Sequence, residues 1–160
     1  MRCLVLSFAL ATAAACGGGG GDPPVDADEA LACQTTGRGE TFTVGLEHAG
    51  KDGMLDFKLM SATPAPPGRD FNSWLIQVNA MAAGVVGAPV TGATISVAPF
   101  MPDHQHGPGA YQPMVTPMPD AGQYKIEQIN TWMPGYWEIT IDATVDQIHD
   151  QTIYKFCIQA

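Results

Sequence analysis

Two histidines separated by a single residue lie near the middle of the sequence, in the segment "APFMPDHQHGPGAYQPM". In an extended segment His104 and His106 would point the same way, because side chains alternate along a strand. Neutral imidazole nitrogens bind copper, zinc and nickel, and thioether sulfur favours Cu(I). Met101 and Met114 flank the pair, so the segment offers both kinds of donor. The pattern indicates a candidate metal site at His104, His106, Met101 and Met114, with copper as the preferred ion.

The same segment is also typical of a simple connection between two strands. Such connections favour Pro, Gly and Asp for their turn geometry alone. Histidines in a turn can hydrogen-bond to backbone carbonyls, and methionines can pack on the end of a sheet. Methionines also occur far away, at Met54, Met60 and Met81. On this alternative the segment is structural or contacts a partner protein, and binds no metal. The sequence leaves both interpretations open.

Catalysis finds little support in the sequence. There is no G-x-S-x-G nucleophile motif, no H-E-x-x-H zinc motif and no phosphate-binding glycine loop after a strand. We therefore expect a binding or structural module that is not an enzyme and has no catalytic residues.

The other two histidines, His48 and His149, are expected at the surface. A solvated face is also expected for three aspartates, Asp142, Asp146 and Asp150.

Composition and charge limit the class of protein. The chain has 160 residues, of which 46% are hydrophobic and 14% charged, as expected for one globular domain with a substantial core. Its formal net charge is -9, and Lys and Arg form no cluster. Nucleic-acid binding depends on clustered positive charge, so we expect no nucleic-acid partner.

The N-terminal segment is typical of an exported protein. Residues 1–15 read as a signal peptide, with one early arginine, a short apolar run and then small residues. The alanines before Cys16 resemble a lipobox, in which Cys16 would be acylated; ordinary cleavage after Ala15 is the alternative. Residues 16–32 are rich in Gly, Pro and Asp and predict a flexible linker. We expect a lipid-anchored protein of the cell envelope, at the outer membrane or the periplasmic face if the host has two membranes.

Two cysteines remain for the folded part, residues 33–160. Cys3 would leave with the signal peptide and Cys16 would carry lipid, so Cys33 and Cys157 are expected to form a disulfide. The bridge would be structural, because the sequence has no C-x-x-C redox motif.

From Glu40 onward, hydrophobic and polar residues alternate in short runs separated by turn residues, which is the pattern of β-strands with one buried face. No segment has a convincing helical period. We expect seven strands, at residues 41–47, 54–61, 72–80, 93–99, 122–129, 136–144 and 152–158.

Each predicted strand has one hydrophobic face. The residues expected to face inward are Phe42, Val44, Leu46, Leu55, Phe57, Leu59, Trp74, Ile76, Val78, Ile95, Val97, Tyr124, Ile126, Trp137, Ile139, Ile141, Tyr154, Phe156 and Ile158. Seven such strands predict an all-β fold, a two-sheet antiparallel sandwich of the immunoglobulin type. Cys157 would then point outward, and the disulfide would hold the Cys33 segment across the outer face of its sheet.

Between Ala62 and Ala143 the order of motifs resembles the YtkA-like domain family. The segments are "SATPAPPGRDFNSWLIQV", "GAPVTGATISVAPFMPDHQHG" and "AGQYKIEQINTWMPGYWEITIDA". The resemblance implies an exported immunoglobulin-like sandwich, found as a lone lipoprotein or beside proteins of metal handling and respiratory-complex assembly. It implies no defined reaction. Tyr136 departs from the pattern, where a smaller residue usually precedes the tryptophan. The matching positions are Met101, His104, His106, Gly107, Tyr124, Met133, Gly135 and Trp137.

Overall fold

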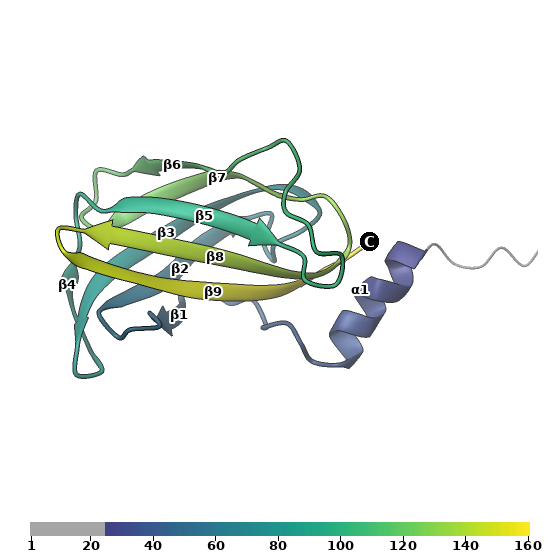
Figure 1. Ribbon diagram of the computed structural model, residues 1–160, viewed down its shortest axis with the longest axis horizontal. Coiled ribbons are helices and arrows are strands. Elements are labelled where there is room, and N and C mark those ends of the chain that lie inside the picture. The colour runs from purple at the N-terminus through teal and green to yellow at the C-terminus, as the bar shows by residue number, and fades with distance from the viewer. Residues whose placement is uncertain (1–24) are drawn as a thin grey trace, which may run out of the picture.

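A computed structural model describes residues 25–160 of the chain (Figure 1). The predicted signal peptide, the lipidation at Cys16 and the first part of the linker lie outside these residues. The described part consists of one helix and nine strands: α1 (Val25–Thr35), β1 (Leu46–Ala49), β2 (Leu55–Thr63), β3 (Asp70–Ala82), β4 (Val85–Pro89), β5 (Thr94–Phe100), β6 (Met114–Pro117), β7 (Gln123–Thr131), β8 (Gly135–Val145) and β9 (Ile148–Ile158).

The strands form two antiparallel sheets packed face to face, as predicted for a β-sandwich. The larger sheet has the order β1-β2-β3-β7-β6, with β4 paired to β3, and the smaller sheet has the order β5-β8-β9. Figure 1 shows the two layers, with β5, β8 and β9 in front. The only helix among residues 25–160, α1, is too short to cross a membrane.

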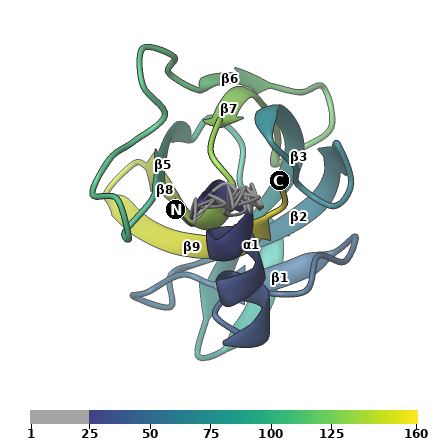
Figure 2. The same cartoon turned by 90° about the vertical axis from the view of Figure 1, so that its right-hand side faces the viewer.

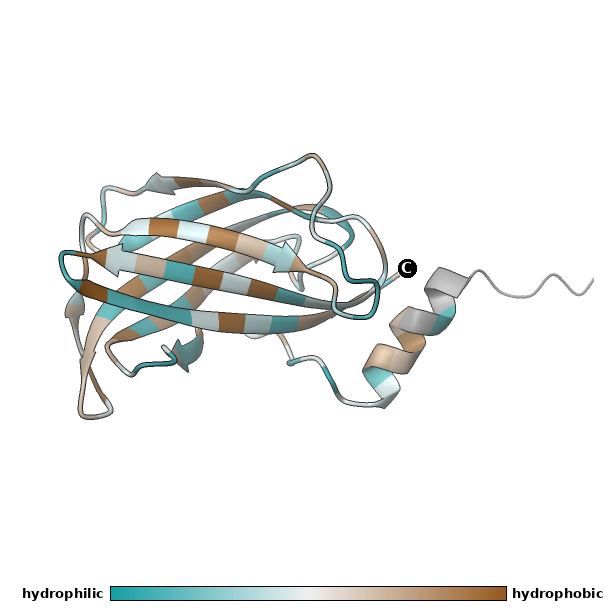
Figure 3. Cartoon of the chain, viewed as in Figure 1, coloured by the Kyte–Doolittle hydropathy of each residue, from teal (hydrophilic) through white to brown (hydrophobic). Residues whose placement is uncertain are grey.

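The core lies between the sheets and is built by the alternation that the sequence shows. Figure 3 displays it as bands of hydrophobic and hydrophilic residues along the strands. The side chain of Trp74 packs edge-on against Tyr154 and Phe156, with ring centroids 5.7 Å apart in both pairs. The inward faces predicted for β2, β3, β7, β8 and β9 are confirmed, because every residue expected there is buried.

The first predicted strand is wrong at its start. Val44 was expected to face inward, but 72% of it is exposed. Gly45 has a φ of 87°, a left-handed conformation that turns the chain, and β1 begins only at Leu46. The alternation through Phe42, Val44 and Leu46 is therefore broken by a turn and does not belong to one strand.

Two strands were not predicted. No strand was predicted between residues 80 and 93, but this Gly- and Pro-rich segment contains β4, which forms a hairpin with β3. The segment after the histidines contains β6, which pairs with β7 at the edge of the larger sheet. Both strands are short and exposed, so they lack the buried face that produces a clear alternating pattern.

The N-terminal helix was not predicted. Residues 25–32 were expected in the flexible linker, but they belong to α1. Ala, Leu and Glu in this segment favour helix, and Ala30 and Cys33 are buried where the helix docks. Figure 2, which looks at this end of the sandwich, shows α1 lying across it.

A disulfide links Cys33 of α1 to Cys157 of β9, as predicted. The two Cα atoms lie 5.6 Å apart, and the bridge spans a sequence separation of 124. Tyr154, Phe156 and Ile158 point into the core, so Cys157 faces outward, as the alternation along β9 requires. The bridge therefore attaches α1 to the outer side of the smaller sheet.

Asp150 does not belong to a solvated face, contrary to the sequence interpretation. It is fully buried, and its carboxylate accepts hydrogen bonds from the backbone amides of Asp52, Met54, Leu55 and Gln151, at 2.8–3.0 Å. Burial acts to raise the pKa of this carboxyl, but the four amides outweigh it and lower the pKa. Asp150 thus attaches the β1–β2 turn to the smaller sheet.

Candidate metal centre

The two histidines lie in a tight turn at the end of β5, and not in the extended segment that was expected. The amide of Met101 donates to the carbonyl of His106 at 2.8 Å, and the amide of His104 donates to the carbonyl of Met101 at 3.2 Å. Gln105, between the histidines, has a φ of 55°, which is uncommon for a residue with a side chain. The turn is therefore a specific conformation held by its own backbone hydrogen bonds.

This turn brings the two imidazoles together. The ring centroids of His104 and His106 lie 5.7 Å apart, and the ring planes are inclined by 54°. His104 is exposed and His106 is half-buried. One ring is thus exposed to solvent beside another that is half-buried.

His106 is enclosed by two tryptophans from the β7–β8 region. Its ring stacks on Trp132, with centroids 4.9 Å apart and planes inclined by 21°, and meets Trp137 edge-on at 5.7 Å. The indole Nε1 of Trp137 donates to the carbonyl of Met133 at 2.9 Å, which fixes that ring. The orientation of His106 is therefore set by packing as well as by the turn.

Hydrogen bonding fixes the tautomer of His106. Its Nδ1 lies 3.0 Å from the carbonyl oxygen of Gly107. A carbonyl can only accept, so Nδ1 carries the hydrogen and Nε2 keeps its lone pair in the neutral ring. Nε2 is buried and has no hydrogen-bond partner among the described residues. A buried nitrogen lone pair without a donor is costly unless something binds it.

The candidate thioethers are separated by the fold. Met101 is fully buried in the core, and its backbone is bonded to that of His106. Met114 begins β6, where it lies opposite Glu127 in the β6–β7 pair and is 51% exposed. The structure therefore joins Met101 to the histidine turn and places Met114 on a different strand of the other sheet.

The carboxylate nearest in sequence to the histidines is already paired. Arg38 donates from Nη1 to Oδ2 of Asp103 at 2.6 Å and from Nη2 to Oδ1 at 2.9 Å. These hydrogen bonds hold the pKa of the Asp103 carboxyl below its usual value. Asp103 is therefore ionised, with both oxygens engaged, immediately before His104. Within residues 25–160, no group of three or more His, Cys, Asp or Glu side chains is arranged to hold a metal ion.

Sequence reasoning identified the histidines but missed the groups that surround them. The stacking of Trp132 on His106 and the pairing of Arg38 with Asp103 join segments 26 and 65 residues apart, and no local spacing predicts such contacts. The only signal was the "TWMPGYW" segment, whose aromatic residues could have been expected near the end of a sandwich.

Comparison with known proteins gives one family match. The family model described as YtkA-like matches residues 52–142. No curated protein matches the chain. Among solved structures, a copper-bound variant of FetP from a uropathogenic strain of Escherichia coli shares 13% sequence identity, with a TM-score of 0.42, and the match covers 71% of this chain and 97% of that one. A similarity of this degree carries no functional argument.

Proposed function

The chain belongs to the YtkA-like family, and from this premise we propose that it is a non-catalytic copper-binding module of the cell envelope. The ion that the residues suit best is Cu(I). His104 and His106 would supply imidazole nitrogens, and Met101 a thioether sulfur. The role of the domain would be to hold the ion, with no chemical conversion of a substrate.

One observation carries this proposal: the Nε2 atom of His106 is buried, carries a lone pair and has no hydrogen-bond donor within residues 25–160. Ligating histidines usually donate their other ring nitrogen to a carbonyl, which fixes the tautomer and orients the ring. His106 has this arrangement through Gly107. The second imidazole, 5.7 Å away, gives the site a partner ligand.

The donor types support Cu(I) over other ions. Imidazole and thioether are neutral, and soft sulfur ligands favour Cu(I), whereas Mg²⁺ and Ca²⁺ require several oxygen ligands. Asp103, the carboxylate beside His104, is engaged by Arg38. The stacked Trp132 and the edge of Trp137 would shield the bound ion from water on the side of His106.

Cu(I) titration in competition with a chromophoric chelator tests this proposal. The wild-type domain is expected to bind one equivalent with a Kd tighter than about 1 μM, equivalent to about 8 kcal/mol. The double variant His104→Ala/His106→Ala should lose at least about a hundredfold in affinity, because two ligands are removed.

The matched control is His149→Ala. His149 is exposed and pairs with Asp142 at 2.7 Å, far along the sequence from the turn. This variant should bind Cu(I) as the wild type does. Equal affinity of the wild type and the double variant would disprove the site.

We also propose that the module is exported and anchored to a membrane through a lipid on Cys16. Support comes from the apolar segment before Cys16, the small residues that precede it and the glycines that follow. A disulfide between Cys33 and Cys157 is compatible with an oxidising compartment outside the cytoplasm.

A second candidate function is contact with an envelope protein. Phe71 and Tyr111 pack edge to face at 4.9 Å, with 49% and 51% of their surfaces exposed. Trp132, which stacks on His106, is also partly exposed. Exposed aromatic side chains are enriched in protein interfaces. Such a contact is compatible with a metal site and does not require one.

A further inference from the structure

We infer that Arg38 determines the metal specificity of the histidine site by keeping the carboxylate of Asp103 out of the coordination sphere. This inference rests on the proposed function, and it assigns a role to a residue that is not itself one of the proposed metal ligands. Arg38 would act as a specificity-determining residue through Asp103, which directly precedes His104.

Arg38 and Asp103 form an ion pair with two hydrogen bonds. The two terminal nitrogens of Arg38 each donate to a different oxygen of Asp103, at 2.6 and 2.9 Å. This two-pronged arrangement matches the planar guanidinium to the carboxylate, which lysine could not do. Both oxygens of Asp103 therefore have a strong donor already.

An exposed ion pair is usually weak and would not fix the position of Arg38 by itself. A second contact also holds this side chain. Its guanidinium lies 4.2 Å from the centre of the Tyr136 ring, in a cation–π arrangement. The hydroxyl of Tyr136 in turn donates to Glu138 at 2.9 Å. Tyr136 thus provides the surface on which Arg38 rests.

The segment that carries Arg38, residues 36–42, is fixed on both sides of it. We call this segment the strap. On one side the disulfide between Cys33 and Cys157 attaches the end of α1 to β9. On the other side the amide of Glu40 donates to the carbonyl of Lys155 at 2.7 Å, and the carboxylate of Glu40 lies 3.2 Å from Nε2 of His48.

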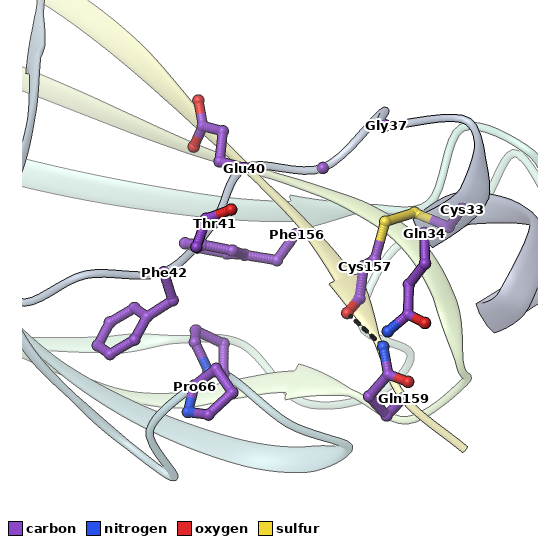
Figure 4. Close-up of a pocket in the computed structure, with 12 residues that line it drawn as sticks. Cys33, Gln34, Gly37, Glu40, Thr41, Phe42, Pro66, Phe156, Cys157 and Gln159 are labelled. Atoms are coloured by element: carbon purple, nitrogen blue, oxygen red, sulfur yellow. Dashed lines mark hydrogen bonds between the residues drawn. A yellow bond between two sulfur atoms is a disulfide. The ribbon is translucent and has the colours of Figure 1, made fainter.

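The strap also lies very close to β9. A Cβ atom on Gly39 would lie 2.8 Å from both the amide nitrogen and the sulfur of Cys157, so only glycine fits there. Figure 4 shows the strap passing the disulfide and Phe156, where these residues line a groove of about 430 Å³. Arg38 is therefore held in place before any metal binds.

The pairing of Arg38 with Asp103 determines which kinds of ligand the site offers to a metal ion. A free carboxylate beside His104 would add a charged oxygen donor to the imidazoles, a set that suits Zn²⁺ and other divalent ions. With Asp103 engaged by Arg38, the site offers neutral imidazole nitrogens, to which the proposed Met101 thioether would be added, and such a set suits Cu(I). Arg38 would thus weaken the binding of divalent ions without touching the metal.

The test is the variant Arg38→Met, with the affinities for Zn²⁺ and Cu(I) measured separately on the folded, oxidised protein. We expect the affinity for Zn²⁺ to rise by at least about tenfold, a typical effect of groups outside the first ligand shell. The affinity for Cu(I) should change much less, because its ligands remain. The ratio of the two affinities is the readout.

Two controls separate the carboxylate from simple loss of positive charge. In Arg38→Met/Asp103→Asn the gain in Zn²⁺ affinity should disappear, because the released oxygen donor is gone. Lys51→Met removes a cation from the β1–β2 turn, and it should leave both affinities unchanged. Far-UV and near-UV circular dichroism would verify that each variant keeps the fold.

The outcomes distinguish this inference from the proposed function. If wild-type protein binds Cu(I) and Arg38→Met shows an unchanged affinity for Zn²⁺, the inference fails and the copper site stands. If the Zn²⁺ gain persists in the double variant, charge removal explains it and the inference also fails. If wild-type protein does not bind Cu(I), the proposed function fails, and this inference with it.

Discussion

The double variant Cys33→Ser/Cys157→Ser is expected to have a free energy of unfolding about 4–5 kcal/mol lower than the wild type. The bridge closes a loop that spans a sequence separation of 124, nearly the whole described domain. Removing it restores the conformational freedom of the unfolded chain and frees α1 from the smaller sheet. The loss is large, because small domains are typically stable by only about 5–15 kcal/mol.

Urea denaturation followed by tryptophan fluorescence would measure this loss. The control is wild-type protein unfolded in the presence of a thiol reductant, which should share the unfolding midpoint of the double variant. A midpoint for the double variant equal to that of oxidised wild type would show that the bridge contributes no stability.

The variant Asp150→Ala is expected to lower the free energy of unfolding by about 3–5 kcal/mol near neutral pH, because it leaves buried amides without an acceptor. Four backbone amides donate to this carboxylate: two of them, those of Asp52 and Met54, belong to the β1–β2 turn, and a third, that of Leu55, begins β2. The turn would lose its attachment to the smaller sheet. Thermal and urea unfolding across a range of pH would measure the effect.

The pH dependence of this variant follows from the lowered pKa of Asp150. A carboxyl whose pKa is lower in the folded than in the unfolded state stabilises the fold fully above the unfolded pKa. That stabilisation is lost as the pH falls through the folded pKa. The ionisation-linked part of the difference between wild type and Asp150→Ala should therefore shrink below about pH 4.

The matched control for Asp150 is Asp142→Ala. Asp142 pairs with the exposed His149, and exposed pairs contribute at most about 1 kcal/mol. A similar loss for both variants, or an Asp150→Ala loss that does not decrease in acid, would contradict the role assigned to Asp150.

The sequence correctly predicted the strands that bury one face and expose the other. Trp74, Ile76 and Val78 alternate with polar residues along β3, and the structure buries all three. The prediction failed where a backbone conformation or a tertiary contact determines the local structure. Gly45 turns the chain after Val44. The segment around Ala30 resembled a linker, and its helix was missed because the helix docks through a disulfide to a distant cysteine.

The candidate site was predictable only in part. The spacing of His104 and His106 indicated neighbouring imidazoles, but the reason given was wrong, since a turn and not a strand brings them together. Asp150 looked like one of three regularly spaced surface aspartates, because three of its four amide donors lie about 100 residues away, in the β1–β2 turn and at the start of β2. Trp132 and Arg38 reach the site through the same kind of long-range contact.

The most direct test of the account is nuclear magnetic resonance of the histidine ring nitrogens in ¹⁵N-labelled protein, before and after one equivalent of Cu(I) is added. In its neutral form, metal-free His106 should carry its hydrogen on Nδ1, because that atom donates to Gly107. On Cu(I) addition the Nε2 signal of His106 and one ring nitrogen of His104 should shift, while the signals of His149 stay in place. A hydrogen on Nε2 of His106, or an Nε2 signal that does not move with Cu(I), would contradict the proposed site.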